Sequence, residues 1–189
     1  CINSNGTITQ LTASPNGSVI TKWMKRTWNG TSWNSWVDEN STTSSIAYGN
    51  IQLITQFVAV YKSGPCAAVN SDTVTITPKA LPYASILAVA PDDTICAGNT
   101  ADLTLLVTNV EVGQTFTITW VEGSQLKSGS GTMVSTGLFT LTTGVLNSTT
   151  SISLQSISTT SGVMCTNPSL NSIATITVQP NPSATLTTV

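Results

Sequence analysis

Hydrophobic and polar residues alternate with a period of two along much of the chain, which is typical of strands that bury one face. In the clearest run, residues 115–121, Phe116, Ile118 and Trp120 face one way and threonines the other. No window has the 3.6-residue period of an amphipathic helix. We therefore predict an all-β protein. Further strands are predicted at 6–14, 18–28, 32–38, 51–63, 72–78, 103–107, 137–143, 150–158 and 172–178.

The chain repeats itself at an offset of about 100 residues. The triplet Thr-Ile-Thr at 75–77 recurs at 175–177. Matching positions farther along the chain are Pro82 with Pro182, Ala84 with Ala184, and Ile86 with Leu186. The repeat predicts two tandem immunoglobulin-like β-sandwich domains, residues 1–79 and 80–180, joined by a short, stiff proline-containing linker. Residues 181–189 are expected to start a following repeat or a linker.

The four cysteines follow the same repeat, with nearly equal intervals from Cys1 to Cys66 and from Cys96 to Cys165. Four cysteines allow three pairings, and the shared spacing favours one disulfide within each half, Cys1–Cys66 and Cys96–Cys165. Four buried thiols are the alternative. Disulfides would indicate an oxidising compartment and therefore export.

The composition offers little for catalysis or for metal binding. The chain has no histidine, which excludes Ser-His and Cys-His nucleophile pairs, and it has no C-x-x-C zinc motif. Adjacent carboxylates occur at Asp38–Glu39 and Asp92–Asp93, with Asp102 nearby. Neighbours on a strand point to opposite faces, so neither pair forms a two-carboxylate site by itself, and a calcium loop motif is missing. We expect no enzyme activity, metal or cofactor.

Charge and hydropathy narrow the possible partners. Charged residues make up 7% of the chain and the net charge is −2, which does not favour nucleic acid. No apolar run approaches the roughly 20 residues that span a bilayer, so direct membrane insertion is not expected. The chain opens on Cys1 without a signal peptide and ends in "SATLTTV", which resembles the start of another strand. We expect an excised, monomeric piece of a longer protein.

Four of the five tryptophans lie in residues 21–36, "TKWMKRTWNGTSWNSW". Asn29-Gly30 is a strong hairpin signal between the strands predicted at 18–28 and 32–38. Loops of two and of four residues sort the side chains alike, whereas loops of three or five residues would reverse the sorting. The even loops place Trp23 and Trp36 on one face, and Lys22, Met24, Arg26, Trp28 and Trp33 on the other.

The two faces of this hairpin suggest different roles. Trp23 matches the position at which immunoglobulin-like domains bury a tryptophan, and Trp120 is its counterpart in the second half. We therefore predict Trp23, Trp36 and Trp120 as core aromatics.

On the other face, Trp28 and Trp33 would form an exposed pair beside Lys22 and Arg26. Aromatic rings stack on sugars and cations attract acidic groups, so this face is a candidate polysaccharide contact. The alternative is a cross-strand pair that only stiffens the hairpin, with Arg26 stacked on a ring.

Three segments resemble a known family: "DDTICAGNTADLTLLV" at 92–107, "FTITWVEG" at 116–123 and "ATITVQPNPSATL" at 174–186. They are similar to the immunoglobulin-like repeats of very large Bacteroidetes cell-surface adhesins. The first half resembles a sister repeat through Trp23, Trp33, the "TQFVAV" strand at 55–60 and Cys66. The likeness covers nearly the whole chain.

The resemblance implies a non-catalytic repeat of an adhesin exported by type IX secretion to the cell surface. Such a repeat would contact neighbouring repeats of the same chain and mediate attachment to solid surfaces or polysaccharide in gliding motility. It also implies possible O-glycosylation at Thr73 and Thr94, within Asp-Thr-aliphatic triplets. One alternative is a carbohydrate-binding or spacer module of a secreted multidomain enzyme, and another is a hydrolase domain with carboxylate chemistry.

Overall fold

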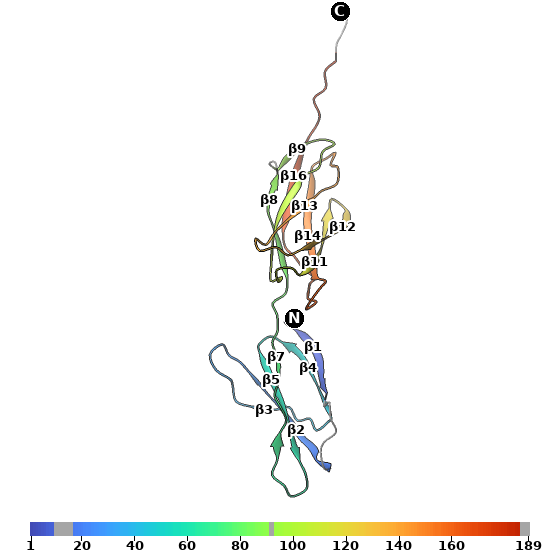
Figure 1. Cartoon of the computed structure of the whole chain (residues 1–189). Coiled ribbons are helices and arrows are strands. Elements are labelled where there is room, and N and C mark those ends of the chain that lie inside the picture. The colour runs from blue at the N-terminus through green and yellow to red at the C-terminus, as the bar shows by residue number, and fades with distance from the viewer. Residues whose placement is uncertain (10–16, 91–92, 186–189) are drawn as a thin grey trace, which may run out of the picture. The chain divides into compact units, whose positions relative to one another are not determined.

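The chain folds into two compact units, Cys1–Ala80 and Leu81–Val189, in a computed structural model that describes residues 1–9, 17–90 and 93–185. Sequence analysis placed the boundary between residues 79 and 80. The described residues form strands and no α-helix, so the predicted all-β fold class is confirmed (Figure 1). No helix long and apolar enough to cross a membrane occurs in those ranges.

The first unit is built from two sheets. β1 pairs with β4, and the larger sheet has the order β3-β2-β5-β6, with β7 also paired to β5. Of the strand predicted at 6–14, residues 10–14 lie outside the described residues. The strands are β1 (Ser4–Thr9), β2 (Val19–Thr27), β3 (Val37–Asp38), β4 (Ser45–Ile51), β5 (Thr55–Lys62), β6 (Val69–Asn70) and β7 (Val74–Ile76).

The second unit is a fuller version of the same sandwich. A three-stranded sheet, β13-β10-β8, faces a larger sheet of order β12-β11-β14-β16-β9, with β15 on β14. The strands are β8 (Tyr83–Ala90), β9 (Thr94–Cys96), β10 (Asp102–Thr108), β11 (Thr115–Glu122), β12 (Gln125–Thr132), β13 (Leu138–Thr142), β14 (Thr150–Thr159), β15 (Thr166–Asn167) and β16 (Ile173–Gln179).

A buried tryptophan lies at the centre of each larger sheet. Trp23 on β2 is 4% exposed and lies opposite Ala59 of β5, and Trp120 on β11 is 6% exposed and lies opposite Leu154 of β14. Immunoglobulin-like domains bury a tryptophan on the equivalent strand. The alternating inward residues of β10, β11 and β14 complete the second core, among them side chains with no exposed area at all: Leu103, Leu105, Ile118, Ile152, Leu154 and Ile157.

The two units share equivalent backbone hydrogen bonds after Cys1 and Cys96. The residue after Cys1 donates to Lys79, and the residue after Cys96 donates to Gln179, both at 2.8 Å from N to O. The next residue donates to the end of β4 in the first unit (Ile51) and to the segment after β13 in the second (Leu146), both at 2.9 Å. Cys1 and Cys96 are therefore structurally equivalent, as are the strands that follow them.

The strand β12 was not predicted because glycines occupy its inward positions. A Cβ on Gly131 would lie 2.7 Å from Phe139 and 2.9 Å from Phe116, and one on Gly129 would lie 3.3 Å from Trp120. The aromatic rings of neighbouring strands fill the space that side chains on β12 would need. The strand therefore lacks the alternation that identifies its neighbours.

The predicted pairing of Cys1 with Cys66 is wrong. Cys1 lies beside Lys79, beyond the Thr55 end of β5, whereas Cys66 follows the other end of β5 after Lys62. The seven residue steps along β5 place these ends roughly 23 Å apart. A disulfide requires its Cα atoms to be within about 7 Å, so the two residues cannot be linked.

The pairing of Cys96 with Cys165 fails for the same reason. Cys96 lies beside Gln179, beyond the Thr150 end of β14, while the carbonyl of Cys165 accepts a hydrogen bond from Thr159 at the opposite end. Nine residue steps along β14 separate these ends by roughly 30 Å. Cys66 and Cys96 are instead free and exposed, and Cys1 and Cys165 are disulfide-bonded.

We predict that two thiols per chain react with a water-soluble disulfide reagent under native, non-reducing conditions. Single Cys66→Ser and Cys96→Ser substitutions should each remove one reactive thiol, because both side chains are exposed. A thiol titration of the folded protein measures this directly. A wild-type chain without reactive thiols would contradict the arrangement.

Candidate functional site

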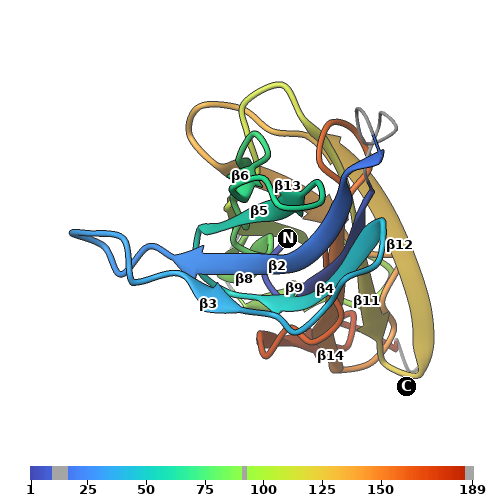
Figure 2. The same ribbon diagram turned by 90° about the horizontal axis from the view of Figure 1, so that it is seen from below.

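The tryptophan-rich segment forms a hairpin that projects from the first unit between β2 and β3 (Figure 2). Trp28 and Trp33 form an isolated antiparallel bridge, which closes a four-residue loop. The Asn29 carboxamide holds this loop, because its Oδ1 accepts the backbone N–H of Thr31 at 2.9 Å and that of Ser32 at 2.8 Å. We call residues 26–37 the aromatic arm.

The register of the arm corrects the assignment of Trp36 to the core. Lys25 lies opposite Val37, and Trp28 lies opposite Trp33. Two residues lie between Lys25 and Trp28, whereas three lie between Trp33 and Val37. The returning segment therefore holds one extra residue. A one-residue shift moves every later side chain to the other face.

Trp36 accordingly lies on the same face as Arg26 and outside the buried core cluster of the unit. It is only partly buried, whereas Trp23 is enclosed. The predicted four-residue loop was therefore compatible with the structure, but the extra residue after Trp33 was not anticipated.

The arm is organised around the guanidinium of Arg26. Its Cζ lies 4.8 Å from the ring centroid of Trp33 and 4.4 Å from that of Trp36. Its Nε donates a 2.8 Å hydrogen bond to Oε1 of Gln56 on β5, which fixes the plane of the group. Trp33 also packs edge-on against Trp28, at a centroid distance of 5.4 Å and an interplanar angle of 64°.

The four residues predicted as a glycan contact are not all gathered in one place. Arg26, Trp28 and Trp33 meet in the arm, whereas Lys22 forms an ion pair with Asp38 at 3.4 Å near its base. The same face of the sheet buries Val58 and Val60 of β5, opposite Met24 and Lys22, so it is not a uniformly solvated surface.

This arrangement supports both interpretations of the tryptophans. Cation–π and edge-to-face contacts account for the order of the arm without a ligand. Each of the three rings nevertheless remains partly exposed on a projecting hairpin, with one cation held between two of them. Partly exposed, pre-oriented rings are suited to stacking on flat apolar surfaces such as those of sugars.

Apart from the aromatic arm, the first unit has a groove between β2 and β4, with a volume of about 400 Å³. Tyr48 and Phe57 line the groove with apolar surface. Lys25 and Glu39 also line it and form an ion pair at 2.9 Å. Because its charges neutralise each other, this groove offers no unpaired charged group to a ligand.

Three of the carboxylates considered for catalysis, those of Asp38, Glu39 and Asp102, are engaged in structural contacts. Asp38 pairs with Lys22, and Glu39 with Lys25. Asp102 accepts a 2.6 Å hydrogen bond from the Thr142 hydroxyl across β10 and β13. Asp92 lies outside the described residues. Within the described ranges no cluster of three or more histidine, cysteine, aspartate or glutamate side chains could hold a metal ion.

Sequence reasoning missed a charge-reversed ion pair that the two units share. In the first unit, Lys25 lies two residues after the buried Trp23 and forms an ion pair with Glu39. The backbone N–H of Glu39 donates a hydrogen bond to the carbonyl of Trp23. In the second unit, Glu122 occupies the position of Lys25, and Lys127 that of Glu39. The tryptophan and the diagonal ion pair are thus kept, while the two charges are exchanged.

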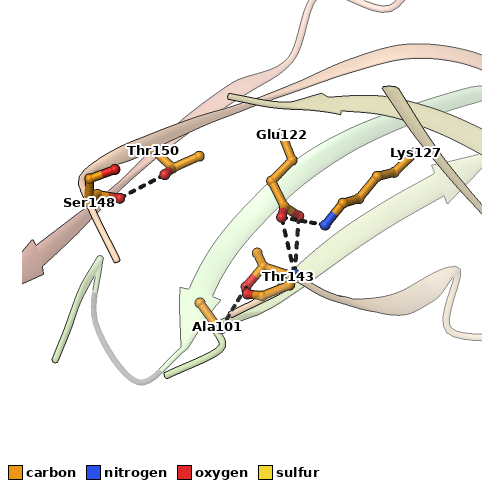
Figure 3. Close-up of polar contacts among 7 residues, drawn as sticks. Ala101, Glu122, Lys127, Thr143, Ser148 and Thr150 are labelled. Carbon is orange, nitrogen blue, oxygen red and sulfur yellow. Dashed lines mark hydrogen bonds and ion pairs between the residues drawn. The ribbon is translucent and has the colours of Figure 1, made fainter. Parts of the chain in front are cut away.

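The pair in the second unit is the more enclosed of the two (Figure 3). The Glu122 side chain is 8% exposed and bonds the ammonium of Lys127. Both carboxylate oxygens also accept the Gly144 N–H at 3.2 Å, and the adjacent Thr143 hydroxyl accepts the Ala101 N–H at 2.9 Å. This cluster fixes the end of β13 against the β11–β12 hairpin, which is a structural role.

The candidate O-glycosylation residues, Thr73 and Thr94, are both exposed. Thr73 lies just before β7, and Thr94 begins β9. Their hydroxyl groups are accessible to solvent, and O-glycosylation at these residues stays a prediction.

We predict that Arg26→Lys loosens the aromatic arm with little loss of overall stability. Lysine keeps the charge but cannot stack as a plane between two rings or donate from Nε to Gln56. The near-ultraviolet circular dichroism of the tryptophans should weaken, while the free energy of unfolding falls by about 1 kcal/mol or less. An unchanged tryptophan signal would contradict the role of Arg26.

We further predict that Glu122→Lys and Lys127→Glu each destabilise the second unit by about 1–3 kcal/mol, since each leaves an enclosed charge without its partner. The double exchange should recover part of this loss, because it reproduces the polarity of the pair in the first unit. Recovery stays partial, since Gly144 N–H loses its carboxylate. Denaturant unfolding of the four proteins gives the coupling energy, and strict additivity would contradict the pairing.

Comparison with known proteins gives little for this site. No protein-family model matches the chain, and no curated protein matches it. Among solved structures, the fibronectin(III)-like modules of Clostridium thermocellum CbhA are similar at a TM-score of 0.38 and 12% sequence identity, with 95% of this chain and 87% of that chain covered.

Proposed function

We propose that this chain is a non-catalytic structural segment of a large bacterial cell-surface adhesin, in which tandem sandwiches act as spacers and the aromatic arm contacts polysaccharide. The observation that carries the proposal is the duplication itself. Two units whose shared strands have the same order, with the same backbone hydrogen bonds after Cys1 and Cys96, are the pattern of a repeat array.

The polar chemistry is consistent with a spacer. The ion pairs at Lys25 and Glu122 connect neighbouring strands, and the hydrogen bond from Thr142 to Asp102 does the same between β10 and β13. The low content of charged residues and the disulfide state of Cys1 and Cys165 support an extracellular location, since disulfides persist in oxidising compartments. Export by type IX secretion and a part in gliding motility belong to this proposal through the family resemblance.

The attachment role is supported by the aromatic arm. The arm places three tryptophans and one cation on a projecting loop, away from the buried core of the unit. Stacking of a ring on a base or a comparable flat partner contributes about 1–3 kcal/mol, so two or three rings could support weak binding that gains strength through repetition.

We predict that Trp28→Ala/Trp33→Ala abolishes polysaccharide binding and leaves the melting temperature near that of the wild type, because neither ring belongs to the core cluster. The wild type, this variant and Ser35→Ala, a matched change at an exposed arm residue, would be tested on an array of neutral and acidic polysaccharides. Ser35→Ala should bind like the wild type.

Three results would count against the attachment role. Binding that persists in the double variant would move the contact elsewhere, and a large fall in melting temperature would show that the rings serve stability. If the wild type binds no polysaccharide on the array, the arm is a stiffened hairpin and the spacer role alone remains.

A further inference from the structure

Arg26 is the cation of β2 that has no acidic partner among the residues that the structure describes. On the same strand, Lys22 forms an ion pair with Asp38 at 3.4 Å, and Lys25 forms one with Glu39 at 2.9 Å. Arg26 instead contacts two tryptophan rings. Because the two ion pairs are each neutral, the net positive charge of this region belongs to Arg26, in a chain whose net charge is −2.

A row of cross-strand neighbours fixes the orientation of the Arg26 guanidinium. Arg26 lies opposite Gln56 of β5, and Gln56 lies opposite Thr75 of β7. The Gln56 carboxamide accepts the 2.8 Å hydrogen bond from Arg26 Nε and donates from Nε2 to Thr75 Oγ1 at 3.2 Å. Both ends of this amide are engaged, and the Nε side of the guanidinium is therefore occupied by the protein.

The opposite edge of the same guanidinium is left without an acceptor. Nη1 and Nη2 also carry N–H donors. Neither atom has a hydrogen-bond or ion-pair partner within the described ranges. The side chain is partly buried, and Trp33 and Trp36 pack against its Cζ. The arm thus holds a cation in a fixed orientation with one hydrogen-bonding edge unused.

This unused edge fits one class of ligand group. The N–H groups of Nη1 and Nη2 lie in one plane, where the paired oxygens of a carboxylate or a sulfate accept both at once. Charge-assisted hydrogen bonds of this kind are roughly twice as strong as those between neutral groups. A sugar hydroxyl also accepts a hydrogen bond but leaves the charge of Arg26 uncompensated. The edge therefore favours an anionic sugar over a neutral one.

We propose that the aromatic arm selects acidic polysaccharides, with the carboxylate or sulfate group of a sugar unit bound by Nη1 and Nη2 of Arg26. Trp33 contacts both Arg26 and Trp28, so the anion-binding edge adjoins the partly exposed rings on which a sugar stacks. This inference rests on the attachment role proposed above and names the class of ligand for that site.

The first test changes only the ligand. Binding of oligogalacturonate to the full chain is compared with binding of the same oligosaccharide after methyl esterification, and dextran sulfate is compared with dextran. The acidic member of at least one pair should bind about tenfold or more tightly than its neutral counterpart, measured by calorimetry. The two pairs show whether a carboxylate or a sulfate ester is the group that Arg26 binds.

The second test supplies Arg26 with a carboxylate from the protein itself. Gln56→Glu keeps an acceptor for Nε but adds a charge that pairs with the guanidinium, so acidic ligands should bind about tenfold or more weakly. The near-ultraviolet circular dichroism of the tryptophans should stay close to that of the wild type, because the arm keeps its contacts. Gln155→Glu, at an exposed position of β14, is the control for the same change in net charge.

A third comparison separates Arg26 from general attraction between charges. Arg26→Gln and Lys62→Gln each remove one positive charge from the first unit, and Lys62 is exposed at the far end of β5. Arg26→Gln should lose the preference for the acidic member of the pair, whereas Lys62→Gln should retain it. Equal weakening by both substitutions would overturn the proposal, as would unchanged acidic binding in Gln56→Glu.

The outcomes for the wild type distinguish this proposal from the attachment role. Equal affinity for the acidic and neutral members of both pairs, lost in Trp28→Ala/Trp33→Ala, would overturn the selection of acidic sugars and leave attachment standing. Absence of binding to all four ligands would overturn both.

Discussion

Each unit depends on one antiparallel strand pair that presents a tryptophan to the core. Trp23 lies in the pair β2–β5 opposite Ala59, and Trp120 lies in the pair β11–β14 opposite Leu154. Burial of an aromatic ring removes about 150–250 Å² from water, which makes it a large contribution to the core. The remaining strands are arranged so that their inward side chains reach this ring, and the ion pairs at Lys25 and Glu122 close over the same hairpins.

The two units keep the buried tryptophan and the ion pair at equivalent positions, but the hydrogen bonding of the tryptophan and the direction of the ion pair differ. Trp23 donates its indole N–H to the Thr43 carbonyl at 2.9 Å, whereas the buried indole nitrogen of Trp120 has no hydrogen-bond partner among the described residues. The diagonal ion pair keeps its place and reverses its charges. Such a pattern follows from what a sandwich core requires, because ring volume and opposite charge both matter while the direction of the charge pair does not.

Strand alternation was sufficient to predict the fold class, because most strands bury one face and leave the other in water. It failed where the neighbouring side chains, and not the strand's own, fill the interior, as at Gly129 and Gly131 of β12. It also placed Ile51 in the same strand as residues 55–62, whereas Ile51 ends β4 and β5 begins at Thr55. At β12 the local sequence lacks the information, which resides in the aromatic residues of other strands.

The sequence predicted the hairpin of the candidate site but placed Trp36 on the wrong face. The arm and the contact between Trp28 and Trp33 follow from the Asn-Gly signal and the four-residue loop, but one extra residue beyond Trp33 transferred Trp36 from the predicted core to the face of Arg26. The cysteine pairing erred in a related way. Equal spacing in two repeats shows that Cys1 and Cys96 are equivalent, and it contains no information on whether Cys1 and Cys66 are close.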